Sequence, residues 1–235
     1  MKVDQKKQSN TMIWFDSSII GTPSEEMFHV QYWEDKNQVV GSAKGRGTTW
    51  FIQLDAMQAA LRHYFRGGLF GKLVKDRYLF TGWCSTRSAR EFQLLLKLNK
   101  SGVNVPRPIA AIARRSLVTY QADLISERVT EAQDLVGVLR QAKLSKNMYK
   151  KIGQEISKIH KAGVIHTDLN IHNILIDSSN NVWIIDFDKC YESNNEKVYP
   201  SNLDRLLRSF RKEQSKGLIH WEEKDFESLV FGYEQ

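Results

Sequence analysis

The sequence predicts an α+β fold of two lobes, a small and mostly β lobe followed by a mostly helical one. Three observations predict it. Short apolar strands broken by glycine and proline dominate the chain before residue 128, helical periodicity dominates it afterwards, and 235 residues are enough for two cores. We expect a first lobe over residues 1–128, with a polar arm at 1–12, and a second lobe over 129–235.

The first lobe is predicted to contain several strands and one main helix. Apolar stretches at 27–33 and 50–54 flank a glycine-rich turn, and 59–65, 110–113 and 117–124 are further candidate strands. Residues 87–100 are predicted as a helix with Ser88 as its N-cap. Two prolines keep 105–108 extended, and 125–129 is the expected link to the second lobe.

The second lobe is predicted to be helical around one hairpin. Residues 132–142 and 148–161 are candidate helices, the second with apolar residues at helical spacing. Residues 174–176 and 182–185 are two short apolar stretches joined by a polar turn, which indicates a hairpin. A last helix is predicted from an apolar stripe, which consists of Leu203, Leu206, Leu207 and Phe210.

Composition and charge limit the classes of function. The net charge is +7 and the pI about 9.3, which indicates an anionic partner or a lysine-rich solvated surface. The two cysteines, Cys84 and Cys190, are far apart and have no CxxC context, which indicates neither a disulfide framework nor a zinc site and fits a reducing compartment. The sequence contains no apolar run that could span a bilayer and no apolar signal region at its polar start, so any work at a membrane is expected at its surface.

The strongest functional signal is the segment HTDLNIHN at 166–173, followed ten residues later by IIDFD at 184–188. Asp168 can accept a proton from an attacking hydroxyl group. Asn173 and Asp186 can offer a neutral and a charged oxygen to one hard cation. This spacing matches the catalytic loop and the metal-binding aspartate of kinases, so we predict a protein-kinase-like fold that uses ATP and Mg²⁺.

Three other residues of this segment have supporting roles or alternative ones. Asn170 stands where many kinases have a lysine that contacts phosphate, and its amide could donate to the γ-phosphate. His166 is expected to pack behind the loop. His172 either faces the cleft or is an ordinary loop histidine.

The nucleotide would need further groups from the first lobe. In GSAKGRGTT, at 41–49, Gly45 and Gly47 permit a tight turn close to phosphate, although a basic hairpin turn is equally typical of this pattern. Arg62 is the predicted cation for the α and β phosphates, paired with Glu91 on the 87–100 helix. Lys72 and Lys75 are alternatives to Arg62. The backbone of Glu127 and Val129 is expected to bind adenine. 

Six segments of the chain together carry a family resemblance. They are LRHYFRGG (61–68), DRY (76–78), RSAREF (87–92), VPRP (105–108), HTDLNIHNIL (166–175) and NLDRLLRSF (202–210). In these segments the chain resembles the Kdo (3-deoxy-D-manno-octulosonic acid) kinases. The resemblance implies transfer of phosphate from ATP to the 4-hydroxyl of Kdo on Kdo–lipid IVA, at the cytoplasmic face of a bacterial inner membrane. It extends more weakly to lipopolysaccharide heptose kinases.

The basic residues then have a candidate role. Arg66 and Arg77 in the first lobe, and Arg205 and Arg208 on the last helix, are predicted to bind anionic groups of the acceptor or of an acidic membrane surface. The segment between Asp188 and Tyr199 leaves little room for an activation loop, which favours a lipid-sugar or small-molecule kinase over a regulated protein kinase.

Two other hypotheses stay open. An enzyme of the same fold could phosphorylate a heptose, an aminoglycoside or a protein, and only a panel of acceptors separates these. A non-catalytic kinase-like module could bind membranes, although the catalytic residues argue against it. No nucleic-acid partner is expected, because basic and aromatic residues do not interleave.

Overall fold

The computed structural model describes residues 1–45, 47–66, 75–217 and 219–235. Arg46 of the glycine-rich turn, Gly67, Gly68 and the candidate cation Lys72 lie outside them. The chain divides into two compact units, which we call the first unit (residues 1–93 and 107–128) and the second unit (residues 94–106 and 129–235). Within the described residues, no helix combines the length and the apolar character that crossing a bilayer requires.

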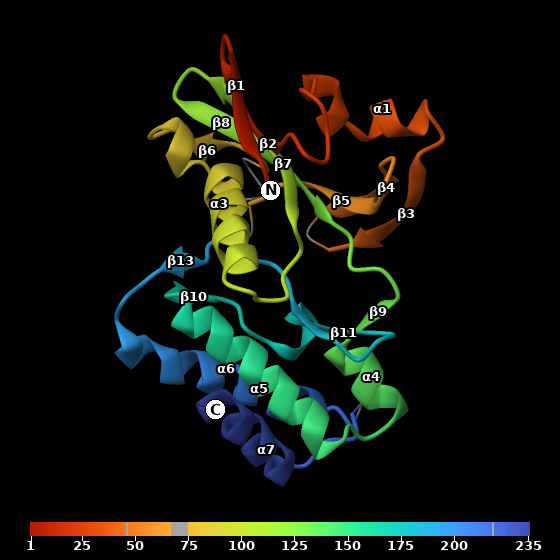
Figure 1. Ribbon diagram of the computed structural model, residues 1–235, viewed down its shortest axis with the longest axis vertical. Helices are drawn as coiled ribbons and strands as arrows, with labels where there is room; N and C mark the ends of the chain where they lie inside the picture. The colour runs from red at the N-terminus through yellow and green to blue at the C-terminus, as the bar shows by residue number, and fades with distance from the viewer. Residues whose placement is uncertain (46, 67–74, 218) are drawn as a thin grey trace. The chain divides into compact units, whose positions relative to one another are not determined.

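The first unit is built on an antiparallel sheet (Figure 1). Its described strands follow the order β1-β2-β7-β8-β5-β4-β3, and β6 also pairs with β8. Their bounds are β1 (Val3–Gln8), β2 (Thr11–Asp16), β3 (Val39–Lys44), β4 (Thr48–Gln53), β5 (Gln58–His63), β6 (Tyr78–Leu79), β7 (Pro108–Ser116) and β8 (Thr119–Glu127).

The predicted polar arm at 1–12 is wrong. Residues 3–8 and 11–16 form a hairpin, and its second strand pairs with β7 from Thr11 to Phe15. The apolar side chains of β2 hold it in place, since Trp14 is only 1% exposed. The polar residues that suggested an arm lie on β1, an edge strand, where charged side chains are usual.

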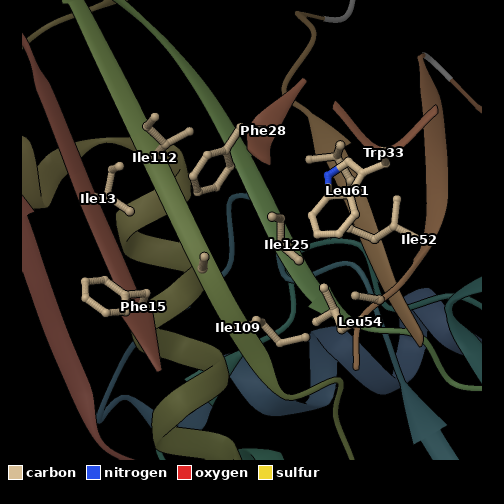
Figure 2. Close-up of a cluster of buried hydrophobic side chains, with 12 residues drawn as sticks. Ile13, Phe15, Phe28, Trp33, Ile52, Leu54, Leu61, Ile109, Ile112 and Ile125 are labelled. Atoms are coloured by element: carbon tan, nitrogen blue, oxygen red, sulfur yellow. The ribbon is translucent and has the colours of Figure 1, made fainter. Parts of the chain in front are cut away.

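The predicted strand at 27–33 is also wrong. Residues Glu25–Phe28 form the short helix η1 and Val30–Glu34 form α1. The indole nitrogen of Trp33 donates to the carbonyl of Met27 at 2.8 Å, which closes this segment on itself. Phe28 and Trp33 then pack on one face of the sheet (Figure 2). Packing of these aromatic side chains has overridden their strand propensity.

The core under that segment comes from inward-facing residues of neighbouring strands, and β7 has a register shift between Pro108 and Ala110. The core includes Ile13 and Phe15 of β2, Ile109 and Ile112 of β7, and Ile125 of β8 (Figure 2). Leu61 of β5 belongs to the same cluster. Since side chains alternate along a strand, Arg62 points to the opposite face.

The opposite face carries the start of helix α3 (Arg87–Lys100), which follows the short helix η2 (Trp83–Ser85). The helix has the predicted bounds, but Ser88 is not its N-cap. The Ser88 hydroxyl donates to the carbonyl of Ile112 at 2.8 Å and so ties the helix to β7. Thr86 precedes the helix, and its carbonyl accepts from the amide of Arg90.

Among the described residues, the second unit contains the end of α3, four further α-helices and short strands. The helices are α4 (Leu135–Gln141), α5 (Lys146–Lys161), α6 (Tyr199–Gln214) and α7 (Glu223–Glu234), with the single turns η3 (Ile171–Asn173) and η4 (Glu196–Val198). The strands are β9 (Ala132–Asp134), β10 (Val164–Ile165), β11 (Ile174–Asp177), β12 (Val182–Ile184) and β13 (Tyr191–Glu192). The predicted hairpin is confirmed as β11 and β12.

Two boundaries differ from the prediction, and one helix was missed. The helix expected at 132–142 starts as strand β9, because the Asp134 carboxylate caps α4 by accepting from the amide of Gly137 at 2.8 Å. The expected link at 125–129 is strand as far as Glu127. Helix α7 was not predicted at all.

Helices α5 and α7 cross closely at two glycines. A Cβ on Gly153 would lie 2.0 Å from the carbonyl oxygen of Leu229, and a Cβ on Gly232 would lie 2.2 Å from that of Lys150. Only glycine, which has no Cβ, permits the two helix backbones to lie this close together.

Candidate active site

The candidate catalytic loop joins β10 to β11 and is organised around His166. This side chain is fully buried, and its Nε2 lies 3.0 Å from the carbonyl oxygen of Ile185. The amide of Asp168 lies 3.3 Å from its Nδ1. A carbonyl only accepts and an amide only donates, so the ring is neutral with its proton on Nε2. Burial lowers the pKa of His166, against the opposing effects of the Ile185 carbonyl and the charges of Asp186 and Asp168.

The structure thus confirms His166 as a packing residue, and it links the two candidate carboxylates. Both Asp168 and Asp186 act electrostatically on the same buried ring. The ring of Phe187 packs edge-on against that of His166, with their centroids 4.8 Å apart. The ring therefore joins the HTD segment to the DFD segment.

Two asparagine side chains hold the backbone of the candidate base. The amide nitrogens of Asn170 and Asn173 both donate to the carbonyl of Asp168, at 2.9 and 3.0 Å. The amide oxygen of Asn170 accepts from the backbone of His172 at 2.9 Å, so this side chain caps η3. Since the Asn173 nitrogen faces a carbonyl, its oxygen is turned away and can face a cation.

Asn173 and Asp186 are brought together by the hairpin. Ile174 pairs with Ile184, and the amide of Ile185 donates to the carbonyl of Asn173 at 3.0 Å. Asp186 follows directly. Its backbone adopts φ +65°, a left-handed conformation that is uncommon for a residue other than glycine. Strained backbone conformations are concentrated at functional positions. There they orient a side chain in a direction that a regular strand would not give it.

A cavity of about 460 Å³ lies beside the loop within the second unit. Asp168 and Asn173 line it, together with residues from one face of α6. The full lining is Asp168, Asn170, His172, Asn173, Arg205, Arg208, Ser209, Lys212 and Glu213. The predicted anion-binding residues Arg205 and Arg208 are therefore in the same cavity as the predicted base.

Arg205 contacts the candidate base directly. Its Nη1 lies 3.0 Å from Oδ1 of Asp168, and both side chains are 47% exposed. A pair this open to water contributes little to stability. It does, however, place a guanidinium group at the carboxylate that would receive the acceptor's proton.

Sequence reasoning missed Ser209 and Glu213. The Ser209 hydroxyl accepts from the amide of Ile171 at 3.2 Å and so ties α6 to the loop. Glu213 is 4% exposed, and its pKa is lowered mainly by its hydrogen bond from Lys216 and further by His172. Helical spacing from Arg205, at i+4 and i+8, could have found both.

His172 is held between two carboxylates at the edge of the cavity. Its Nδ1 lies 3.3 Å from Asp134 and its Nε2 lies 3.6 Å from Glu213. It lines the cavity and is also a paired loop histidine, so the two alternatives raised from the sequence are not exclusive.

In the first unit, the structure pairs Arg62 with Glu91. The Nη2 atom of Arg62 lies 2.5 Å from each carboxylate oxygen, and the hydroxyl of Tyr64 donates to Oε2 at 2.7 Å. Glu91 is 4% exposed and Arg62 27%. The alternative cation Lys75 is exposed.

The other candidate residues of the first unit are placed as follows. The amide of Gly45 donates to the carbonyl of Gly47 at 2.8 Å, and a Cβ on Gly47 would overlap the ring of Phe65 at 2.2 Å. Packing on Phe65 therefore accounts for this glycine without a phosphate. Arg66 stacks over the ring of Tyr78 at 5.2 Å, and Arg77 is exposed.

The adenine-binding prediction falls at the end of β8. The amide of Glu127 donates to the carbonyl of Arg107 at 2.8 Å, and its carboxylate accepts from the amide of Arg107 at 3.1 Å. These two hydrogen bonds fix Glu127, which is the penultimate residue of the first unit. Val129 begins the second unit's main segment.

Comparison with known proteins identifies the family. The sequence profile of the lipopolysaccharide kinase (Kdo/WaaP) family matches residues 30–233. Proteins named 3-deoxy-D-manno-octulosonic acid kinase are similar throughout. The one from Vibrio parahaemolyticus is 62% identical over 97% of this chain and 96% of its own length. The one from Haemophilus influenzae is 41% identical over 99% of this chain and 100% of its own length.

A solved structure of WaaP in complex with acyl carrier protein is similar in fold. Its TM-score is 0.59, over 90% of this chain and 86% of that chain, with 13% sequence identity. At this identity the likeness shows the fold alone, and it confirms the predicted kinase-like α+β class. The chain belongs to the lipopolysaccharide kinase (Kdo/WaaP) family and is a phosphotransferase that acts on a hydroxyl acceptor.

Proposed function

We propose that this protein transfers the γ-phosphate of ATP to the 4-hydroxyl of Kdo on Kdo–lipid IVA, at the cytoplasmic face of the inner membrane. The observation that carries the proposal is the cavity in which Asp168 and Asn173 lie with Arg205, Arg208 and Lys212. It combines a candidate base with cations suited to an acidic sugar or a lipid phosphate. The names of the full-length relatives support Kdo as the acceptor.

Asp168 is proposed as the general base. Its carboxylate accepts the proton of the acceptor hydroxyl as the hydroxyl oxygen forms a bond to the γ-phosphorus. The bond from that phosphorus to the bridging oxygen breaks, and ADP leaves with the electron pair. Asn170 and Asn173 hold the carbonyl of Asp168 and so position its carboxylate. Asn170 could also turn its amide toward the γ-phosphate.

Asn173 and Asp186 are proposed to hold Mg²⁺. One amide oxygen and one carboxylate are the hard ligands that suit this ion, which takes its other ligands from water and phosphate. The orientation of the Asn173 amide fits the role, because its nitrogen is committed to Asp168. When bound, the ion would neutralise charge on the phosphate oxygens.

The remaining groups are proposed to bind the ends of the two substrates. Arg62, held by Glu91, would contact the α and β phosphates, with Gly45 and Gly47 near them and the backbone of Glu127 and Val129 at adenine. Arg205 and Arg208 would bind an anionic group of the acceptor. Arg66 and Arg77 would bind further phosphates or lipid headgroups.

The proposal is tested with labelled ATP, Mg²⁺ and an acceptor panel of Kdo–lipid IVA, the same lipid carrying heptose, and an aminoglycoside. We expect phosphorylation of Kdo–lipid IVA and a loss of about 10²–10⁴-fold in kcat for Asp168→Asn, which keeps the shape but not the basicity. Undiminished turnover by that variant would contradict Asp168 as base. Labelling of only the heptose or aminoglycoside acceptor would contradict the proposed substrate.

A further inference from the structure

Three apolar side chains gather at one end of the first unit and are left in water. Leu117 is 87% exposed, Val118 68% and Leu79 66%. They come from the turn between β7 and β8 and from β6, which pairs with β8 (Figure 1). The amide of Phe80 donates to the carbonyl of Val118 at 2.9 Å, which holds the two segments side by side. We call Leu79, Leu117 and Val118 the apolar tip.

The conformation of the turn makes a leucine there costly. Ser116 pairs with Thr119, so Leu117 and Val118 form a two-residue turn. Leu117 has φ +54°, a conformation for which such turns favour glycine or asparagine. Burial does not offset the cost, because the side chain is almost wholly exposed. Glycine would relieve this conformation and lose little buried surface, so contacts within the described residues do not account for a leucine at this position.

Arginines flank the apolar tip. The Nε of Arg115 donates to the carbonyl of Leu117 at 2.9 Å, and its guanidinium lies over the ring of Phe80 at 4.7 Å. Arg77 precedes β6 by one residue. Both arginines are exposed, and neither forms an ion pair with a residue of the described ranges. The carboxylate next to Arg77, Asp76, is occupied by His63 and Gln121.

We propose that the apolar tip inserts into the surface of an anionic lipid bilayer. Exposed leucine and valine side chains would enter the boundary between headgroups and acyl chains, and Arg77 and Arg115 would meet lipid phosphates. A protein partner would be expected to bury a larger apolar patch than three side chains. The inference rests on the proposed function for its site of action at a membrane, but it does not depend on phosphoryl transfer.

The test uses the full chain and two kinds of vesicle, one of phosphatidylethanolamine with phosphatidylglycerol and one of phosphatidylcholine. The variant Leu117→Gly, alone and with Val118→Asn, removes apolar surface and relieves the strained φ. We expect an equal or higher Tm together with about a tenfold loss of binding to the anionic vesicles. Weaker vesicle binding together with an unchanged or higher Tm would separate a membrane role of these side chains from damage to the fold.

Two controls complete the design. Val40→Asn changes another exposed apolar residue of the same unit and should leave vesicle binding unchanged. Arg77→Gln should weaken binding to anionic vesicles but not to phosphatidylcholine. If the Leu117 variants bind anionic vesicles as tightly as the unaltered chain, the proposal is wrong and the apolar tip is left for a protein partner. Tip-dependent binding without Kdo phosphorylation would instead overturn only the proposed function.

Discussion

At the residue scale, the hydrogen-bond partners of a few side chains determine their protonation and orientation. His166 illustrates this, because a carbonyl on one ring nitrogen and an amide on the other define a single neutral tautomer. The sequence was sufficient to predict its role, since its partners lie in the same loop or in the facing hairpin. Asp168 is different, because its Arg205 partner is 37 residues away and its distance could not be read from spacing.

Arg62 is predicted to act in both stability and nucleotide binding. Arg62→Ala removes a cation from a carboxylate that is 4% exposed, so we expect a loss of about 1–3 kcal/mol in the free energy of unfolding. We also expect a higher KM for ATP. Adding Glu91→Gln removes the buried charge and should restore stability without restoring the KM. Recovery of both in the double variant would contradict a role for Arg62 at the phosphates.

Arg205 is predicted to bind the acceptor rather than ATP. Arg205→Ala should raise the KM for the acceptor by about tenfold, the loss expected for one charge-assisted contact, and leave the KM for ATP unchanged. Arg211→Ala is the matched control, because Arg211 lies on the same helix but pairs with Glu223 outside the cavity. Equal effects of the two variants on steady-state kinetics would mean that only net charge matters.

At the scale of elements, segments specified by local spacing were predictable, and segments that depend on packing against other parts of the chain were not. The bounds of α3 and the hairpin of β11 and β12 agree with the sequence pattern, because local spacing specifies them. The segment at 25–34 was misassigned, because the aromatic side chains that made it resemble a strand are used to cover the sheet. Helix α7 has a glycine where it crosses α5, which weakened its signal.

The close crossing of α5 and α7 predicts that a glycine-to-alanine change there lowers stability, whereas the same change in an exposed helix raises it. In an exposed helix, glycine to alanine stabilises by about 1 kcal/mol. Gly232→Ala should instead destabilise by about 1–3 kcal/mol, because the new Cβ meets the backbone of Lys150, which cannot turn aside. Gly21→Ala, with nothing within 4 Å of the added Cβ, is the neutral control. Chemical denaturation measures both, and a stabilised Gly232→Ala would show that the helices do not pack this closely.

At the scale of the whole molecule, buried histidines are expected to make stability depend on pH. His160 lies between a hydroxyl of Tyr233 at 2.8 Å and the amide oxygen of Asn202 at 3.2 Å, so it joins α5 to α7 and α6. Burial lowers the pKa of His160, against the hydrogen bond to Asn202, and lowers that of His166. For His63, hydrogen bonds to Asp123 and Asp76 outweigh burial and raise the pKa.

The histidines with lowered and raised pKa values change stability in opposite directions as the pH falls. Below about pH 6.5 the unfolded chain binds protons that folded His160 and His166 do not, so stability falls as the pH falls. His63 acts in the opposite sense, adding stability in acid that is lost as the pH rises through its folded pKa. We expect Tm to fall between about pH 7.5 and about pH 5.5, and to fall less in His160→Gln. His220→Gln, at an exposed histidine, is the control, and an equal fall in both variants would contradict the role of His160.

The sequence by itself predicted the kinase-like class, the candidate catalytic loop with Asp168, Asn173 and Asp186, and the pairing of Arg62 with Glu91. These depend on order and spacing along the chain, which a helix, a hairpin or a short loop converts directly into position. Only the tertiary structure decided that Arg205 meets Asp168 in one cavity, that residues 3–16 extend the sheet, and that Leu79 joins Leu117 and Val118 at an exposed tip. Each of these joins segments far apart in sequence, so it depends on strand register and helix rotation, which packing selects and local pattern does not encode.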